Sequence, residues 1–170
     1  MTATQLVTAD ELYQMGSNAP YELWEGVLKE VSPSSWKPGV VAARVVGVLI
    51  NYVDMHSLGY VSTAESGYIL NANPYTVVAP DAAFVRGDRY SGDMGESGFY
   101  PVPPDLAVEV ISPSDRKSDM AQKQALYAKA EVPLVWWVDP IRKTVTVYRL
   151  GQVPEVVEAT GVLDGGDVLP

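Results

Sequence analysis

The sequence predicts an α/β fold with a mixed β-sheet of five or more strands flanked by helices. Strand and helix patterns alternate along the chain, residues 106–111 form an apolar run between turn signals, and residues 40–56 are apolar at helical spacing. The chain has 170 residues, of which 47% are hydrophobic, which is enough for a full core. We therefore expect residues 1–170 to form a single domain.

The first elements are a short helix and a β-hairpin. Thr8-Ala-Asp-Glu11 has the pattern of a capping box and predicts a helix that ends near Met15. Residues 21–24 and 27–31 have the composition of strands, and Glu25-Gly26 supplies a tight turn between them.

A long helix and two long strands follow. Residues 32–39 form a loop rich in proline and serine, and residues 40–56 have few polar positions, which predicts a helix packed on both sides. Residues 60–70 and 76–85 are expected to be strands, joined by a turn-rich hairpin loop at residues 71–75.

The second half begins with residues 86–104, whose glycines and prolines predict an exposed loop. The remaining elements are expected in the order strand, helix, strand, strand, at residues 106–111, 115–130, 134–139 and 144–148. Trp136 and Trp137 are adjacent in a strand, so their side chains should lie on opposite faces. The tail after Gly151 is weakly patterned.

The composition argues against several classes of site. The chain has no cysteine and one histidine, His56, which excludes disulfides and cysteine–zinc sites and disfavours a Ser-His-Asp triad. No apolar run approaches the ~20 residues of a membrane span, and the N-terminus lacks the regions of a signal peptide. We therefore expect a cytoplasmic protein without a membrane partner.

The net charge of −9 argues against broad, non-specific binding to nucleic acid, which depends on lysine and arginine. A local basic patch is still compatible with this charge. Its candidate members are Lys37, Arg116, Lys117, Lys123 and Lys129.

Two acidic residues interrupt apolar strands, and each has alanine neighbours on its own face. Asp81 shares a face with Ala79 and Ala83, and Glu109 shares one with Ala107. Small neighbours leave room for a metal ion and a substrate, and a buried carboxylate needs a cation. Alternatively, Asp81 is a turn residue after proline, and Glu109 is a member of a structural ion pair.

Short motifs in a fixed order cover residues 8–150. They are Tyr21-Glu22-Leu23 with Gly26, Ser32-Pro33, Ala79-Pro80-Asp81, Pro104-Asp105-Leu106, Val108-Glu109-Val110, Ser112-Pro113-Ser114, Asp119, Lys123, Tyr127, Val132-Pro133 and Trp137-Val138-Asp139. Together they resemble the Uma2 family of restriction-endonuclease-like proteins, in the PD-(D/E)xK nuclease superfamily. The resemblance implies a restriction-endonuclease-like core and hydrolysis of DNA with Mg²⁺ or Mn²⁺.

The resemblance also implies roles for individual residues. Asp81 and Glu109 would be catalytic and would hold the metal. Lys123, on the helix that follows, would replace the strand lysine of the superfamily, because Ile111 occupies that position. Glu22 would be a further catalytic residue, either as a metal ligand or through contacts with the other site residues.

The position of Lys123 gives a geometric expectation. A helix that folds back across the sheet would place its Nζ atom within ~6 Å of an acid of the site. Lys117, in the first turn, is the competing lysine, and Gln122 and Gln124 should point away from the acids. Two residues lie one turn either side of Lys123 on the same face: Asp119 and Tyr127. Without the resemblance, a solvated surface lysine is the simpler interpretation.

One departure from the family pattern favours an alternative function. Family members often have a histidine before the long helix, where this chain has Trp36-Lys-Pro-Gly39. The chain could therefore be a non-catalytic binding or accessory module with a residual metal site. A glycosidase with two carboxylates is a third hypothesis, which exposed aromatic residues along a cleft would support.

We also expect a homodimer, because cutting both strands of a DNA duplex usually takes two active sites. The apolar residues 134–138 and 145–150 are candidates for its interface.

Overall fold

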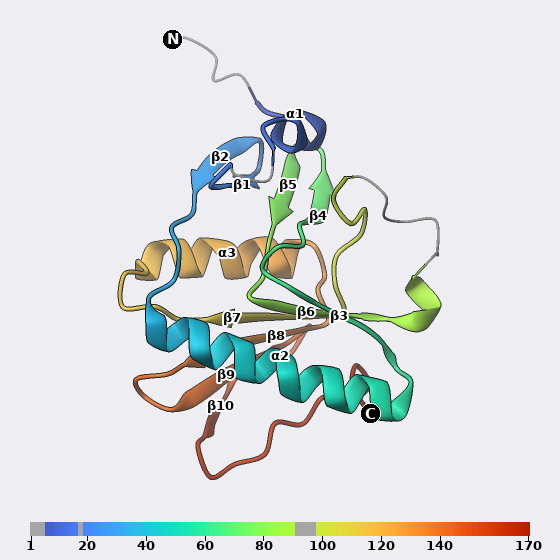
Figure 1. The fold of residues 1–170 in the computed structure, drawn as a ribbon, viewed down its shortest axis with the longest axis vertical. Coiled ribbons are helices and arrows are strands. Elements are labelled where there is room, and N and C mark those ends of the chain that lie inside the picture. The colour runs from blue at the N-terminus through green and yellow to red at the C-terminus, as the bar shows by residue number, and fades with distance from the viewer. Residues whose placement is uncertain (1–5, 17–18, 91–97) are drawn as a thin grey trace.

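The computed structural model describes residues 6–16, 19–90 and 98–170, which form two β-sheets and three α-helices (Figure 1). One sheet has four antiparallel strands in the order β2-β1-β5-β4. The other has six strands in the order β10-β9-β8-β7-β6-β3, of which only β7 and β8 pair in parallel. The predicted α/β fold with a mixed sheet is confirmed.

The two sheets divide the strands as follows. The smaller sheet contains β1 (Tyr21–Trp24), β2 (Val27–Glu30), β4 (Tyr68–Ala72) and β5 (Tyr75–Val78). The larger sheet contains β3 (Gly59–Thr63), β6 (Ala82–Arg86), β7 (Leu106–Val110), β8 (Leu134–Asp139), β9 (Thr144–Arg149) and β10 (Glu155–Glu158). The helices are α1 (Ala9–Gln14), α2 (Trp36–His56), α3 (Lys117–Lys129) and the 3₁₀ turn η1 (Gly87–Arg89).

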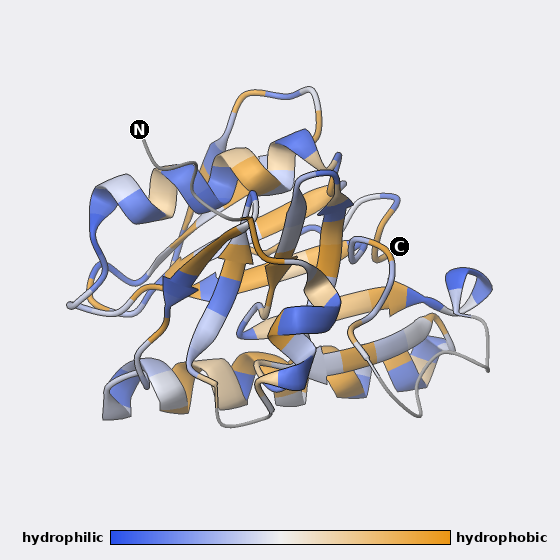
Figure 2. Cartoon of the chain, turned by 90° about the horizontal axis from the view of Figure 1, so that it is seen from above, coloured by the Kyte–Doolittle hydropathy of each residue, from blue (hydrophilic) through white to orange (hydrophobic). Residues whose placement is uncertain are grey.

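The larger sheet is the centre of the core, with α2 on one face and α3 on the other (Figure 1). Many of the hydrophobic residues, coloured orange in Figure 2, lie on the strands. Trp136 packs on the α2 side and Trp137 on the α3 side, and both are buried. The prediction that these side chains lie on opposite faces is confirmed, and core packing accounts for both.

The N-terminal predictions are confirmed in detail. Glu11 N–H donates to Thr8 Oγ1 at 3.2 Å, and Thr8 N–H donates to Glu11 Oε2 at 2.8 Å, which completes the capping box of α1. Glu25 and Gly26 both have positive φ angles, 50° and 82°, as a type I′ turn requires. This turn joins β1 to β2.

The two long strands predicted at residues 60–70 and 76–85 are each two strands, one in each sheet. The first is interrupted between β3 and β4 and the second between β5 and β6. Pro80 lies in the second break, because a proline cannot donate to a sheet ladder. The chain therefore crosses from one sheet to the other within residues 79–81.

Helix α2 differs from its prediction in both extent and packing. It begins at Trp36, earlier than expected, and Pro38 is tolerated because it lies in the first turn. It is packed on one side only, since Val48 and Met55 are 70% and 78% exposed. By length and composition it is also the one helix of the described chain that could cross a membrane, although charged residues such as Arg44 and Asp54 interrupt its apolar positions.

The C-terminal part contains one strand that the sequence did not predict, and one expectation about this part is wrong. The weakly patterned tail contains a further strand, β10, which pairs with β9 and covers its outer edge. Residues 134–138, proposed as part of a dimer interface, belong to β8 in the middle of the larger sheet, where Leu134 and Val135 are fully buried. Because β8 lies between β7 and β9 and both of its faces are covered by core residues, it has no free surface for a partner.

The close approach of two strands gives a stability prediction. A Cβ atom at Gly59 would lie 2.1 Å from the carbonyl oxygen of Val85, whereas one at Gly47, in α2, would meet nothing within 4 Å. Gly59→Ala should lower the free energy of unfolding by ~1–3 kcal/mol or more. Gly47→Ala should raise it by ~0.5–1 kcal/mol, because alanine is the better helix former. Urea unfolding followed by circular dichroism measures both, and equal effects would contradict the packing of β3 against β6.

Candidate functional site

The candidate site lies in a cleft of about 1960 Å³ between the two sheets, on the α3 side of the larger sheet. Four of the residues that line the cleft come from four separate segments of the chain. They are Glu22 on β1, Asp81 before β6, Glu109 on β7 and Lys123 on α3. The structure thus brings all four predicted site residues to one cleft.

Asp81 lies at a bend one residue before β6, where the sequence had predicted the middle of a strand. Its Oδ2 atom accepts a hydrogen bond of 2.7 Å from the backbone N–H of Val110. Burial raises the pKa of Asp81, although this hydrogen bond and the nearby charge of Lys123 oppose the shift. The hydrogen bond from Val110 attaches Asp81 to the neighbouring strand β7.

Glu109 is 7% exposed and lies on the α3 face of β7, where it is paired in register with Trp137. Its Oε1 atom accepts hydrogen bonds from Lys123 and from the hydroxyl of Tyr127. Burial raises the pKa of Glu109 to about 7, against the attraction of Lys123 and with repulsion from Glu22. The same burial, together with the negative charge of Glu109, raises the pKa of Tyr127 well above its ordinary value, so the hydroxyl is a donor.

Lys123 lies between two acids. Its Nζ atom is 2.8 Å from Glu109 Oε1 and 2.9 Å from Glu22 Oε1, so the expected approach of this lysine to an acid is observed. Burial alone lowers the pKa of Lys123, but the attraction of Glu109 and Glu22 outweighs burial and the net shift is upward. The lysine is therefore a permanent cation. The competing Lys117 is exposed at the first position of α3.

Glu22 has a donor on each of its oxygens. Oε1 accepts from Lys123 and from the backbone N–H of Ala79 at 2.9 Å, and Oε2 accepts from Trp24 Nε1 at 2.8 Å. Both oxygens of Glu22 are thus engaged by donors of the protein, one of which is the Lys123 ammonium group. The role of Trp24 was missed in the sequence, although two strand residues separated by one position share a face.

The other residues of α3 follow the prediction in part. Tyr127 reaches Glu109 as described, but Asp119 pairs with Lys29 on β2 at 3.0 Å. Gln122 is exposed, as expected. Gln124 was expected to point away from the site, yet its Oε1 atom accepts a hydrogen bond of 2.7 Å from Trp137 Nε1. The reason is that the indole N–H is part-buried beneath α3 and needs an acceptor.

The predicted basic patch is not assembled. Lys129 forms an ion pair of 2.6 Å with Glu25, at the opposite end of α3 from Arg116. Lys123 is committed to its two acids, and Lys37 belongs to α2, on the other side of the larger sheet. Arg116 lines the cleft, so it is the cation of this group that is available to a ligand there.

The remaining carboxylate oxygens suit a hard cation. Asp81 and Glu109 each have one oxygen engaged by the protein, and no described residue donates to the other oxygen. Among the described residues no group of three or more histidine or acidic side chains is arranged so that it could hold a metal ion. A site with two carboxylates matches Mg²⁺, which binds one or two carboxylates and keeps several waters.

Comparison with known proteins identifies the family. The family model Uma2, described as "Putative restriction endonuclease", matches residues 9–170. A crystal structure described as "a putative nuclease belonging to DUF820", from Anabaena variabilis, has a TM-score of 0.82 and 20% identity over 96% of this chain and 91% of that chain. At this identity the likeness shows the fold. No curated protein matches the sequence. Because the family model covers almost all of the residues, the chain belongs to the Uma2 family of restriction-endonuclease-like proteins.

Proposed function

We propose that the protein is a metal-dependent nuclease that hydrolyses phosphodiester bonds of DNA in the cleft between its two sheets. The observation that carries this proposal is the contact of Lys123 with Glu109 and Glu22 in the cleft that Asp81 also lines. The family supports it, because its description names a restriction endonuclease.

Asp81 and Glu109 would hold Mg²⁺ or Mn²⁺ through the oxygens to which no described residue donates. A metal bound there supplies Lewis acidity and lowers the pKa of a bound water. The protein contributes a fixed geometry, because the backbone N–H of Val110 orients Asp81 and the hydroxyl of Tyr127 orients Glu109. Residues held by such second contacts keep their positions when a substrate enters.

Lys123 would stabilise the negative charge that develops on the phosphate in the transition state. Its raised pKa keeps it protonated at neutral pH, so it does not act as a base. Glu22, on β1, holds the ammonium group of Lys123 at 2.9 Å and thereby keeps it in the cleft. Glu22 is thus a positioning residue in this proposal.

Two alternatives have specific support. A non-catalytic module with the same fold agrees with the net charge of −9. It also agrees with the lack of a histidine before the long helix, where this chain has Trp36-Lys-Pro-Gly39. A glycosidase agrees with the aromatic residues along the cleft, among them Tyr60, Tyr90 and Tyr100. The match to a nuclease-like family favours the nuclease over both.

A cleavage assay tests the proposal. Purified protein with Mg²⁺ or Mn²⁺ should cut DNA, and Asp81→Asn and Glu109→Gln should lose both cleavage and calorimetric metal binding. Lys123→Met should lose cleavage by ~100-fold or more and keep metal binding, because the carboxylates remain. Lys117→Met removes a lysine of the same helix and should retain full activity. Absence of DNA cleavage with either ion would favour the non-catalytic module.

The buried cation also gives a prediction about stability. Removing one partner of a buried ion pair costs ~3–5 kcal/mol, because the other charge is left unpaired. We expect Lys123→Met to lower the free energy of unfolding by about this amount at pH 8 and by less at pH 5. The sign follows from Glu109, whose pKa is about 7 and rises further without the lysine, so at pH 5 it is neutral and needs no cation.

Urea unfolding of wild type, Lys123→Met and Lys117→Met at both pH values measures this difference. The exposed Lys117 should show little effect at either pH. A loss for Lys123→Met that is the same at pH 5 and pH 8 would contradict the assigned charge of Glu109.

A further inference from the structure

Two tyrosines form an aromatic surface at the side of the cleft, away from the acids. Tyr60 and Tyr90 lie with their ring centroids 4.3 Å apart and their planes tilted by 43°. Both line the cleft, and Tyr60 is 54% exposed. A second tyrosine pair lines the same cleft: the rings of Tyr68 and Tyr100 lie 5.4 Å apart, and the hydroxyl of Tyr68 contacts Ser62.

The register of the larger sheet places Tyr60 on the same face as the catalytic acids. Tyr60 lies on the edge strand β3, directly opposite Val85 on β6, whose side chain packs in the core beneath α3. Asp81 lies four residues before Val85 along the chain. At ~3.3 Å per residue and ~4.8 Å between strands, Tyr60 is ~14 Å from Asp81. A short segment of one DNA strand can span this distance.

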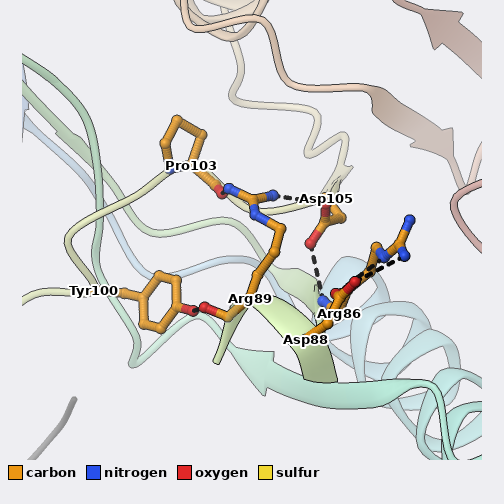
Figure 3. A network of polar contacts seen from close by, with 6 residues as sticks. All are labelled: Arg86, Asp88, Arg89, Tyr100, Pro103 and Asp105. Atoms are coloured by element: carbon orange, nitrogen blue, oxygen red, sulfur yellow. Dashed lines mark hydrogen bonds and ion pairs between the residues drawn. The ribbon is translucent and has the colours of Figure 1, made fainter. Parts of the chain in front are cut away.

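A network around the buried Asp105 holds Arg89, the residue that precedes Tyr90 (Figure 3). Asp105 accepts from the backbone N–H of Arg86 at 2.9 Å and from the Arg89 guanidinium at 2.6 Å. Arg89 also donates to the carbonyl of Pro103 at 3.1 Å, and its own carbonyl accepts from Tyr100. Arg89 is therefore held at three points, by Asp105, Pro103 and Tyr100, which restricts the backbone beside Tyr90 before any ligand binds.

The charge of the cleft argues against a duplex as the preferred ligand. Among the described residues that line it, seven are carboxylates and three are cations, and Lys123 and Lys29 are already paired with acids. Duplex binding depends on cations that neutralise phosphates. Single strands gain in addition from bases stacked on aromatic rings, a contribution of similar size for every base. Paired bases are stacked within the duplex and cannot use such rings.

We propose that Tyr60 and Tyr90 bind an unpaired base by stacking, so that the ligand of the cleft is single-stranded DNA or a segment with unpaired bases. The proposal rests on the proposed nuclease function for the reaction, and it assigns the substrate class and the site that recognises it. One strand then runs from the tyrosine pair through the cleft to the acids.

An oligonucleotide without backbone charge isolates the stacking contribution. The probe is a fluorescent single-stranded oligodeoxynucleotide with methylphosphonate linkages, measured by anisotropy without added metal. Wild type should bind it, and Tyr60→Ala should weaken binding by ~10- to 100-fold, whereas Tyr60→Phe should stay within about threefold. Annealing the probe to its complement should weaken binding at least about tenfold. Arg89→Ala, which frees the backbone beside Tyr90, should also weaken it.

Tyr52→Ala is the matched control. Tyr52 is on α2, outside the cleft, and it stacks on His56 at 4.5 Å with the same tilt of 43°. Its removal should leave probe binding unchanged. Equal effects of Tyr60→Ala and Tyr52→Ala, or duplex binding as tight as single-strand binding, would overturn the proposal. Tyr60-dependent binding of a soluble glucan in place of the probe would overturn it in favour of a carbohydrate.

The outcomes separate this proposal from the nuclease proposal. If the protein cuts duplex DNA through Asp81 and Tyr60→Ala changes nothing, the stacking site is refuted and the nuclease stands. If binding depends on Tyr60 and no DNA is cut with any metal, the stacking site stands and the protein is a binding module for single strands.

Discussion

The structure depends on one buried cation held between two carboxylates. Lys123 reaches Glu22 on the smaller sheet and Glu109 on the larger sheet from a helix that belongs to neither. These two contacts join three layers at a point where apolar packing alone would leave buried charges unpaired. The same contacts bring a cation beside the acids that would hold a metal, so the chemistry and the cohesion of the fold depend on the same atoms.

Much of the fold could be predicted from the sequence where local patterns were strong. The run at 106–111, the capping box at Thr8 and the Glu25-Gly26 turn each have a local physical cause, and each is found where expected. What could not be predicted depends on contacts between distant segments. Helix α2 is apolar on its exposed face, so its composition suggested more burial than it has. Gln124 turns inward because its side chain accepts a hydrogen bond from the indole of Trp137 on β8. The residues of α3 alone do not reveal this contact.

The candidate site was predicted from the family pattern more than from periodicity. Spacing alone allowed Lys123 to be a surface residue. Strand alternation predicted which face Asp81 shares with its neighbours, but it did not predict that Asp81 lies at a bend. Residues that act through the backbone, such as the N–H of Val110 and of Ala79, leave no trace in side-chain identity. A sequence shows which acids exist, but the donors that orient them depend on how the chain crosses between sheets.

That crossing has a consequence for how such proteins can diversify. Three residues, 79–81, connect the two sheets and end at the acid, so an insertion there would move Asp81 relative to Glu109 and Lys123. The segment between η1 and β7 contains none of the acids or the lysine of the site, and its last residue, Asp105, attaches it to Arg89. Its length and composition can change while the acids and the lysine stay in register. Reaction chemistry and ligand preference are therefore carried by separable parts of the chain, and selection can alter one without rebuilding the other.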